Sequence, residues 1–405
     1  MSNNRRRNLF EDLLREHEEE QDEITQMQQE DSDTDSDDDE VFPDWSKQID
    51  ELIDRASQAG KIEEEAFGVY VHFSTQEFLE LFGFVQDVLT PSGRGKKPKF
   101  DPMTQFFIAL YFCRTYRTNI SLAIDFGVKI GVVKEIPFKV MRKCIPVLKR
   151  ELMKVYSQTR CRELNIQFQH YPEALLVGDC SVQARKRPGN ASQSLYYDGK
   201  HKCHTLKWYY SHYPSGYVCQ KSELHKGSKF DKTVLMSCVE ETKELLLKTQ
   251  TEMRLRDRGE EHARYPNHWA IIFDKGFQGM ISELRAILPK KKPRNGTLTA
   301  TERRKNRQIG EDRIICENFY GRKKILWKAT RDKTRHEDKE MDLIDEFCTL
   351  LTNYDIIRRP LRNEDGVYYK NYLKKIKREG MELKRKRQEK NRRYRANVLR
   401  RRVGD

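Results

Sequence analysis

Apolar and polar residues alternate in two different ways along this chain, and the change comes near residue 165. Over residues 46–90 apolar positions recur every three or four residues, which predicts amphipathic helices. The segment STQEFLELFGFVQDVL starts with Ser74 and Glu77 at capping-box spacing, so we expect a helix to begin there. A basic stretch broken by Gly and Pro, TPSGRGKKPKFDP, follows as a linker, and we delimit this part as residues 46–99.

Residues 100–160 are also expected to be helical and fit a helix-turn-helix. Ala123 is small where two helices would cross, Gly127 would make the tight turn, and Val133 would pack the second helix back. That second helix would lie in the major groove, although Pro137 would end it early. It offers few residues that could contact DNA, chiefly Lys129 and Lys134. The alternative is a small helical bundle without a role in DNA binding.

From residue 165 to 357 the pattern becomes α/β, with buried strands between amphipathic helices. ALLVGDCSV predicts a strand that ends at Asp179, and WAIIF predicts a later strand that ends just before Asp274. Residues 203–224 read as two strands joined by a Pro-Ser-Gly turn. The remaining predicted elements are helices at 228–250, capped by Asp231, at 298–326, opened by Thr299 and Glu302, and at 338–357.

Charge is distributed unevenly and changes the expected class of partner. Residues 1–50 hold 18 Asp and Glu against 5 Lys and Arg, so the remaining chain carries a net charge of +27. We expect a disordered acidic tail over residues 1–45 and a basic, partly helical tail over residues 358–405. A body this basic favours a nucleic acid as partner. The nine cysteines are scattered without a CxxC pair, which argues against a disulfide framework and favours a reducing compartment, and we expect no membrane span.

Three carboxylates occupy positions from which they could converge. Asp179 and Asp274 follow buried strands, and Glu317 lies in a helix beside Ile314, Ile315 and Phe319, so we expect it to face the sheet. Clustered carboxylates repel one another and raise each other's pKa, and divalent cations such as Mg²⁺ remove that conflict. Two such ions could support an in-line phosphoryl transfer. Gly276 would let the backbone turn aside so that DNA could approach.

The motifs GDCSV, YYDGKHKCHTLKW, GSKFD, DKGFQG and LTATERRKNRQIGEDRIICENFYGRKKI resemble those of the DDE transposases of the PIF/Harbinger and insertion-sequence type, often called DDE superfamily endonucleases. The resemblance covers about residues 74–355. It implies an RNase H-like catalytic domain, a mixed sheet flanked by helices, over residues 165–357. An all-α helix-turn-helix region would precede that domain.

The resemblance also implies an activity and its residues. The protein would be a nuclease that cuts transposon ends in double-stranded DNA and joins the freed 3′-hydroxyl to target DNA, with Mg²⁺ or Mn²⁺ as cofactor. Asp179, Asp274 and Glu317 correspond to the catalytic, metal-binding triad, and Asp231 to a further metal-site aspartate or else a helix cap. The family usually has histidine before that aspartate, where this chain has Phe230. The basic residues expected to hold DNA phosphates near the site are Lys200, Lys202, Lys207, Lys275, Arg313, Arg322 and Lys323.

Two other interpretations remain open. The chain could be a domesticated, transposase-derived nuclear protein that binds DNA without cutting it, or a chromatin or RNA-binding protein that depends on its charged tails. The C-terminal KRKRQEKNRRYRANVLRRR suits a nuclear import signal and a grip on the DNA backbone equally well. We expect a nuclear location, a homo-oligomer in the synaptic complex and, as a further partner, an accessory DNA-binding protein.

Overall fold

The structure is a computed structural model that describes residues 46–58, 61, 63–91, 98–189, 193–294 and 296–361, with single positions at 378, 385, 389 and 392. The expected acidic tail and nearly all of the basic tail lie outside the described residues. The helices that precede the sheet are α2 (Ser46–Gln58), α3 (Glu63–Val71), α4 (Thr75–Leu89), α5 (Pro102–Thr115), α6 (Asn119–Asp125), α7 (Ile130–Val133), α8 (Ile136–Leu152) and α9 (Gln158–Glu163).

The sheet is mixed, as the α/β pattern predicts, and its central strand is β1. Its strands are β1 (Ala174–Ala184), β2 (Tyr197–Asp198), β3 (Cys203–His212), β4 (Val218–Lys221), β5 (His225–Lys226), β6 (Ala270–Ile272) and β7 (Ala286–Ile287). The order is β2-β3-β1-β6-β7, with β4 and β5 also paired to β3. Strand β1 is antiparallel to β3 and parallel to β6, and β6 is parallel to β7. The Pro-Ser-Gly turn joins β3 to β4, with Gly216 at φ 88°.

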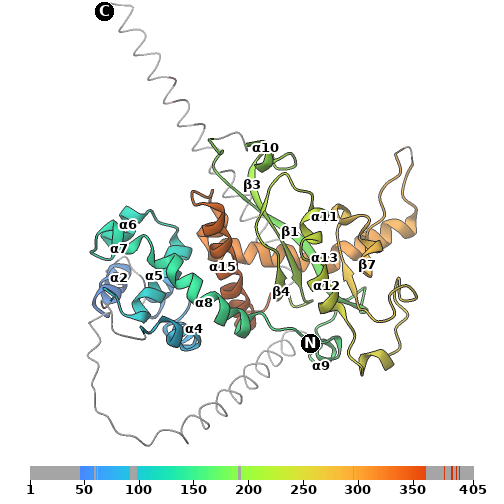
Figure 1. The fold of residues 1–405 in the computed structure, drawn as a ribbon, viewed down its shortest axis with the longest axis horizontal. Coiled ribbons are helices and arrows are strands. Elements are labelled where there is room, and N and C mark those ends of the chain that lie inside the picture. The colour runs from blue at the N-terminus through green and yellow to red at the C-terminus, as the bar shows by residue number, and fades with distance from the viewer. Residues whose placement is uncertain are drawn as a thin grey trace, which may run out of the picture.

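Helices cover both faces of this sheet (Figure 1). The helices that follow β1 in the chain are α10 (Gln193–Tyr196), α11 (Asp231–Met236), α12 (Val239–Leu246), α13 (Ala300–Leu326), α14 (Lys328–Arg331) and α15 (Asp338–Arg358). The short 3₁₀ turns are η1 (Glu252–Arg254), η2 (Lys275–Phe277) and η3 (Met280–Ser282). Alternate residues of β3 enter two cores. Trp208 and Tyr210 pack in the core shared with α13, α15 and the N-terminal helices, and Tyr209 packs in the core shared with α11 and α12.

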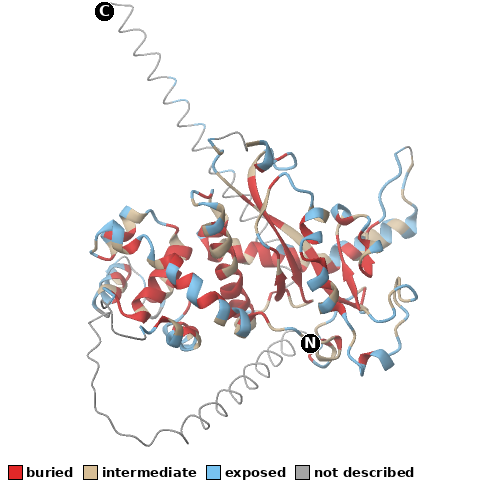
Figure 2. Ribbon diagram, in the orientation of Figure 1, coloured by how far each residue is buried: buried red, intermediate tan, exposed pale blue. Residues whose placement is uncertain are grey.

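Capping boxes explain where two long helices begin. Ser74 accepts a hydrogen bond from the Glu77 backbone and starts α4, and Thr299 does the same with Glu302 at α13. Both starts were predicted from the sequence and are confirmed. Buried residues concentrate in the sheet, in α5 and α15, and on the inner face of α8 (Figure 2).

The N-terminal helices are fixed to the α/β part through the buried carboxylate of Asp355. It accepts hydrogen bonds from His72 at 2.9 Å, from Arg322 at 2.6 Å and from Arg359 at 2.9 Å. Burial acts to raise the pKa of Asp355, but the hydrogen bond from His72 and the charges of His72 and Arg322 outweigh it and hold the pKa below its usual value. The pairing joins α15, α13 and the turn after α3 into one body.

Three local predictions differ from the structure. Strand β1 continues to Ala184, so Asp179 lies in its middle and not at its end. The helix expected over 228–250 is divided into α11 and α12, because the chain leaves helical geometry at Cys238 (φ −135°). Pro137 sits at the first turn of α8, where proline is tolerated, and therefore begins a helix instead of ending one.

The predicted helix-turn-helix is recognisable only in part. Gly127 has φ +60° at the turn, and Val133 is fully buried, as expected. However, α6 has 7 residues and α7 has 4, so the segment expected to enter the major groove is a single helical turn. The helix-turn-helix therefore stays a prediction.

Candidate active site

Asp179 belongs to the sheet face that α13 covers. Side chains on a strand alternate between faces, and Val177, two residues earlier, packs in the core on the α13 side. The Asp179 Oδ1 atom accepts a hydrogen bond from the Cys180 backbone at 2.8 Å, and the side chain is 18% exposed. The Tyr320 hydroxyl of α13 donates to the Asp179 backbone carbonyl at 3.1 Å. The fold thus holds this carboxylate under a long helix.

Asp274 comes directly after β6, the parallel neighbour of β1, as the sequence predicted. It caps the 3₁₀ turn η2, and its Oδ1 atom accepts from the Gly276 backbone at 2.6 Å. A Cβ atom on Gly276 would lie 2.9 Å from both the Asp274 Oδ1 atom and the Asp231 Oδ2 atom. Gly276 does not adopt positive φ, so its role differs from the expected turn: it leaves room for two carboxylates.

Asp231 lies at the start of α11 but does not cap it. The N-cap residue is Phe230, and no side-chain cap hydrogen bond is formed there. The Asp231 Oδ1 atom instead accepts from the Lys207 Nζ atom of β3 at 2.9 Å. The helix-capping interpretation of Asp231 is therefore wrong, and the residue joins the group around Gly276. Phe230 itself is 79% exposed beside this group.

The charges of Asp274 and Asp231 both act on Asp179, and we call Asp179, Asp231 and Asp274 the aspartate cluster. Burial raises the pKa of Asp179 to about 6, the nearby Arg313 guanidinium opposes that rise, and the charges of Asp274 and then Asp231 add to it. A raised carboxyl pKa at converging acids is typical of functional sites. The structure therefore brings together two members of the predicted triad and the fourth predicted metal-site residue.

Glu317 does not join the cluster. The stripe of α13 that faces Asp179 contains Arg313, Cys316 and Tyr320, whereas Glu317 is exposed. This contradicts the expectation that it faces the sheet. Two basic residues of the same helix bond other groups: the Arg313 Nη2 atom donates to the Asp179 Oδ2 atom at 3.0 Å, and Lys324 Nζ donates to the Val182 carbonyl at 3.4 Å.

The donor chemistry of the cluster suits a hard divalent cation, because it consists of carboxylate oxygens. The positions of these side chains, however, do not suit a bound cation. In the described part of the chain, no three carboxylate, imidazole or thiolate side chains lie where they could hold a common ion. One oxygen of Asp179 is occupied by the Arg313 guanidinium, and Glu317 points to solvent. The residues thus supply the right atoms in an arrangement that is not assembled for a metal.

The basic residues expected to contact DNA fall into two groups. Exposed ones are Lys129, Lys134, Lys200, Lys202 and Lys275. The others are occupied by carboxylates: Lys207 by Asp231, Arg313 by Asp179, and Arg322 by Asp355. Lys323 is 1% exposed and bonds Asp345 at 2.8 Å, so the expectation that it holds DNA is wrong.

Sequence reasoning missed an exposed basic segment, which spans residues 290–307 and which we call the basic arm. It connects β7 to the first turns of α13, the helix that covers the cluster (Figure 1). The charge run KKKPR followed by ERRKNR could have identified it from the sequence. Its exposed basic side chains are Lys290, Lys291, Lys292, Arg294, Arg303, Arg304 and Arg307.

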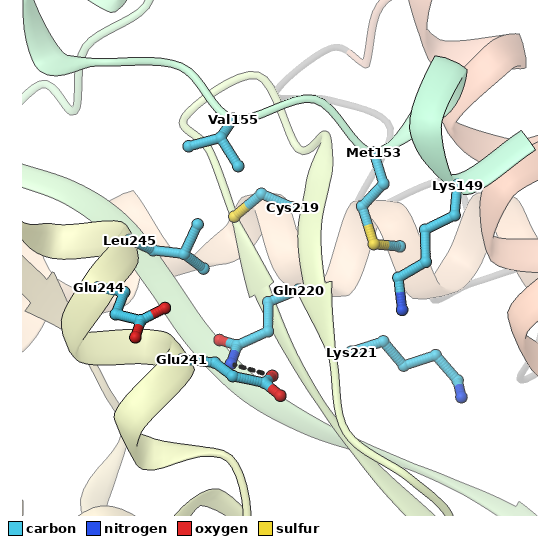
Figure 3. A pocket seen from close by; sticks show the side chains of 9 residues that line it. All are labelled: Lys149, Met153, Val155, Cys219, Gln220, Lys221, Glu241, Glu244 and Leu245. Carbon is cyan, nitrogen blue, oxygen red and sulfur yellow. Dashed lines mark hydrogen bonds between the residues drawn. The ribbon is translucent and has the colours of Figure 1, made fainter. Parts of the chain in front are cut away.

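A cavity of about 360 Å³ lies elsewhere, between the end of α8, strand β4 and helix α12 (Figure 3). Its polar lining is already bonded in part: Gln220 donates to Glu241 at 3.3 Å, and Lys149 pairs with Glu346 at 3.2 Å. None of the cluster residues lines it. The aspartate cluster therefore lies outside this cavity.

Comparison with known proteins agrees with the site's position in the fold. Residues 178–353 match the family model described as DDE superfamily endonuclease, a span that begins beside Asp179 and contains the aspartate cluster and Glu317. The chain is also 24% identical over 291 residues to the "Probable transposase for insertion sequence element IS702" of Microchaete diplosiphon, which covers 68% of this chain and 91% of that protein. No solved structure matches. No helix in the described ranges is long and apolar enough to cross a membrane. The domain match and the relative together support a DDE transposase.

Proposed function

We propose that this protein is a DDE-type transposase that cuts double-stranded DNA at transposon ends and transfers the freed strand to target DNA. The observation that carries the proposal is the convergence of Asp179, Asp231 and Asp274 within the matched domain. These carboxylates come from the central strand, from the end of its parallel neighbour and from the start of a helix. The fold does not require three acids to lie near one another. A catalytic need explains why their mutual repulsion is retained.

The strand order supports an RNase H-like domain, with β1 between an antiparallel and a parallel partner. We assign Asp179, Asp274 and Glu317 as the catalytic carboxylates and Asp231 as an additional acid of the site. Mg²⁺ or Mn²⁺, as a pair of ions, would be the cofactor and would supply Lewis-acid stabilisation of a phosphodiester undergoing in-line displacement. Catalysis of phosphoryl transfer depends mainly on stabilising the charge of the transition state. The chain's own carboxylates and nearby basic groups can contribute to the electrostatic potential at the site.

DNA is the proposed partner because exposed basic residues border the site. Lys275 follows Asp274 directly, and the basic arm leads into α13, which also carries Arg313 and Glu317. Such contacts give affinity that depends on salt and little sequence preference. Assembly of a homo-oligomer on paired ends, an accessory DNA-binding protein and a nuclear location complete the proposal, the last because of the basic C-terminal segment.

Nicking of supercoiled plasmid DNA that carries the element's terminal repeats tests this function. The wild-type protein should nick with Mg²⁺ or Mn²⁺ and stop when EDTA is added. Asp274→Asn should lose at least a hundredfold in rate, since one essential charge is removed, while DNA binding by gel shift persists. Asp87→Asn, an exposed change on α4, is the matched control and should nick normally.

Two outcomes would separate this proposal from its rivals. Wild-type protein that binds DNA but never nicks would favour a domesticated DNA-binding protein. Loss of all nucleic-acid binding when residues 371–405 are deleted would favour a protein that depends on its basic tail.

A further inference from the structure

We propose that Arg313 is an internal cation that keeps the aspartate cluster closed and must leave Asp179 before a divalent ion can bind there. This inference rests on the proposed function. Its starting observation is the contact between the Arg313 Nη2 atom and the Asp179 Oδ2 atom at 3.0 Å. The other carboxylate oxygen of Asp179 accepts from the Cys180 backbone at 2.8 Å, so both oxygens already have a donor.

An ion and the guanidinium cannot share this position. Divalent ions bind carboxylate oxygens at about 2.1 Å, inside the contact distance that the guanidinium requires. The Arg313 side chain is only 20% exposed, so two positive charges there would be weakly screened. Asp274 is also near enough to act electrostatically on Arg313, although the carboxylate that the guanidinium contacts is that of Asp179. The lack of an assembled three-ligand site therefore has a specific cause in this chain.

The Arg313 guanidinium also makes fewer hydrogen bonds than we expect for a buried arginine with a purely structural role. Its Nε atom is buried and has no hydrogen-bond partner among the described residues. Arg285 offers a contrast in the same domain: its Nε bonds the Glu260 carbonyl, and both terminal nitrogens bond Asp257. An unsatisfied buried donor costs free energy, so the Arg313 position is the easier one to vacate.

The position of Glu317 fits this exchange. It lies one helical turn after Arg313 on α13, and residues at that spacing occupy neighbouring places on a helix surface. When Arg313 withdraws from Asp179, the space beside that carboxylate opens next to the Glu317 position. The described state is thus the closed state of the site, and the exposed Glu317 is the acid that would complete the open state.

Isothermal titration of Mn²⁺ into the full chain without DNA tests the inference at pH 8, which is above the raised pKa of Asp179. Arg313→Gln should bind Mn²⁺ about tenfold more tightly than wild type, the size of effect expected when one neighbouring charge stops competing. Arg313→Lys keeps a cation and should stay near the wild-type affinity. Arg256→Gln, an exposed change between η1 and β6 and outside the basic arm, is the matched control and should leave Mn²⁺ binding unchanged.

Thermal unfolding gives a second readout, and its discriminating part is the rise in melting midpoint on adding Mn²⁺, which a purely structural role of Arg313 would not change. Without metal, Arg313→Gln should melt lower than wild type; with saturating Mn²⁺ its midpoint should rise more than that of wild type. Equal or weaker Mn²⁺ affinity in Arg313→Gln, with normal binding by wild type, would overturn the inference and leave the proposed function standing. Absence of Mn²⁺ binding in both proteins would overturn the inference and the metal cofactor together.

Discussion

Asp179→Asn should make the protein more stable at pH 8, although it removes an acid that we assign to catalysis. Burial, opposed by Arg313 and reinforced by Asp274 and Asp231, raises the pKa of Asp179 from 3.8 to about 6. A difference of about 2 pKa units corresponds to roughly 3 kcal/mol between the charged and neutral forms. Asparagine resembles the neutral form, and its Oδ1 atom can still accept from the Cys180 backbone. We therefore expect a gain on the order of 1–3 kcal/mol in the free energy of unfolding.

The sign of the pH dependence follows from where the proton binds. Between about pH 4 and pH 6 the folded protein retains the Asp179 proton while the unfolded chain has lost it, so the Asp179 contribution to stability falls as pH rises through this window. Above the window the penalty is constant. The stabilisation by Asp179→Asn should consequently be close to zero at pH 4 and complete at pH 8.

The assay is thermal or urea unfolding of wild type and variant at both pH values without divalent ions. Asp198→Asn is the control of opposite sign: burial acts to raise the pKa of Asp198, but the His201 hydrogen bond at 2.7 Å and two backbone donors outweigh it and lower the pKa. That variant should lose stability at pH 8. A less stable Asp179→Asn protein at pH 8 would refute the reasoning that the Asp179 charge is held at a cost.

Other substitutions test separate parts of the account. Asp345→Asn leaves the buried Lys323 ammonium without its carboxylate and should cost about 3–5 kcal/mol in urea unfolding; an unchanged midpoint would contradict that pairing. Gly276→Ala should slow plasmid nicking with DNA affinity retained, because its Cβ would push two carboxylates apart; wild-type nicking would show that the spacing does not matter. Replacing Lys290, Lys291 and Lys292 by Gln should weaken DNA binding and reduce the salt slope by about 1 per lost phosphate contact, measured by fluorescence anisotropy at several salt concentrations. A salt slope equal to that of wild type would remove the basic arm from the DNA path.

The sequence predicted those features that depend on local pattern. Capping boxes at Ser74 and Thr299 and the Pro-Ser-Gly turn between β3 and β4 are short-range signals, and the structure has them where expected. The position of Asp274 after a buried strand is of the same kind. The length of β1 could not be predicted: the strand continues past Asp179 because β3 pairs with it from Val177 to Ala184, a long-range cause that the segment itself does not reveal.

The side-chain partners at the site could not be derived from pattern. Glu317 has apolar neighbours on both sides, yet the rotation of α13 is set by Ile315, Cys316 and Phe319, which turn Glu317 outward. Asp231 stands before a helix and looks like a cap, but Lys207 from β3 takes its carboxylate. Both errors come from tertiary contacts that override a local rule.

Crystals of the full chain soaked in Mn²⁺ would test the central claim most directly, through the anomalous scattering of the bound ion. The account predicts an anomalous peak within about 2.2 Å of carboxylate oxygens of Asp179 and Asp274, with Arg313 withdrawn from Asp179. A peak bound only by other residues, or no peak at the aspartate cluster at saturating Mn²⁺, would contradict it.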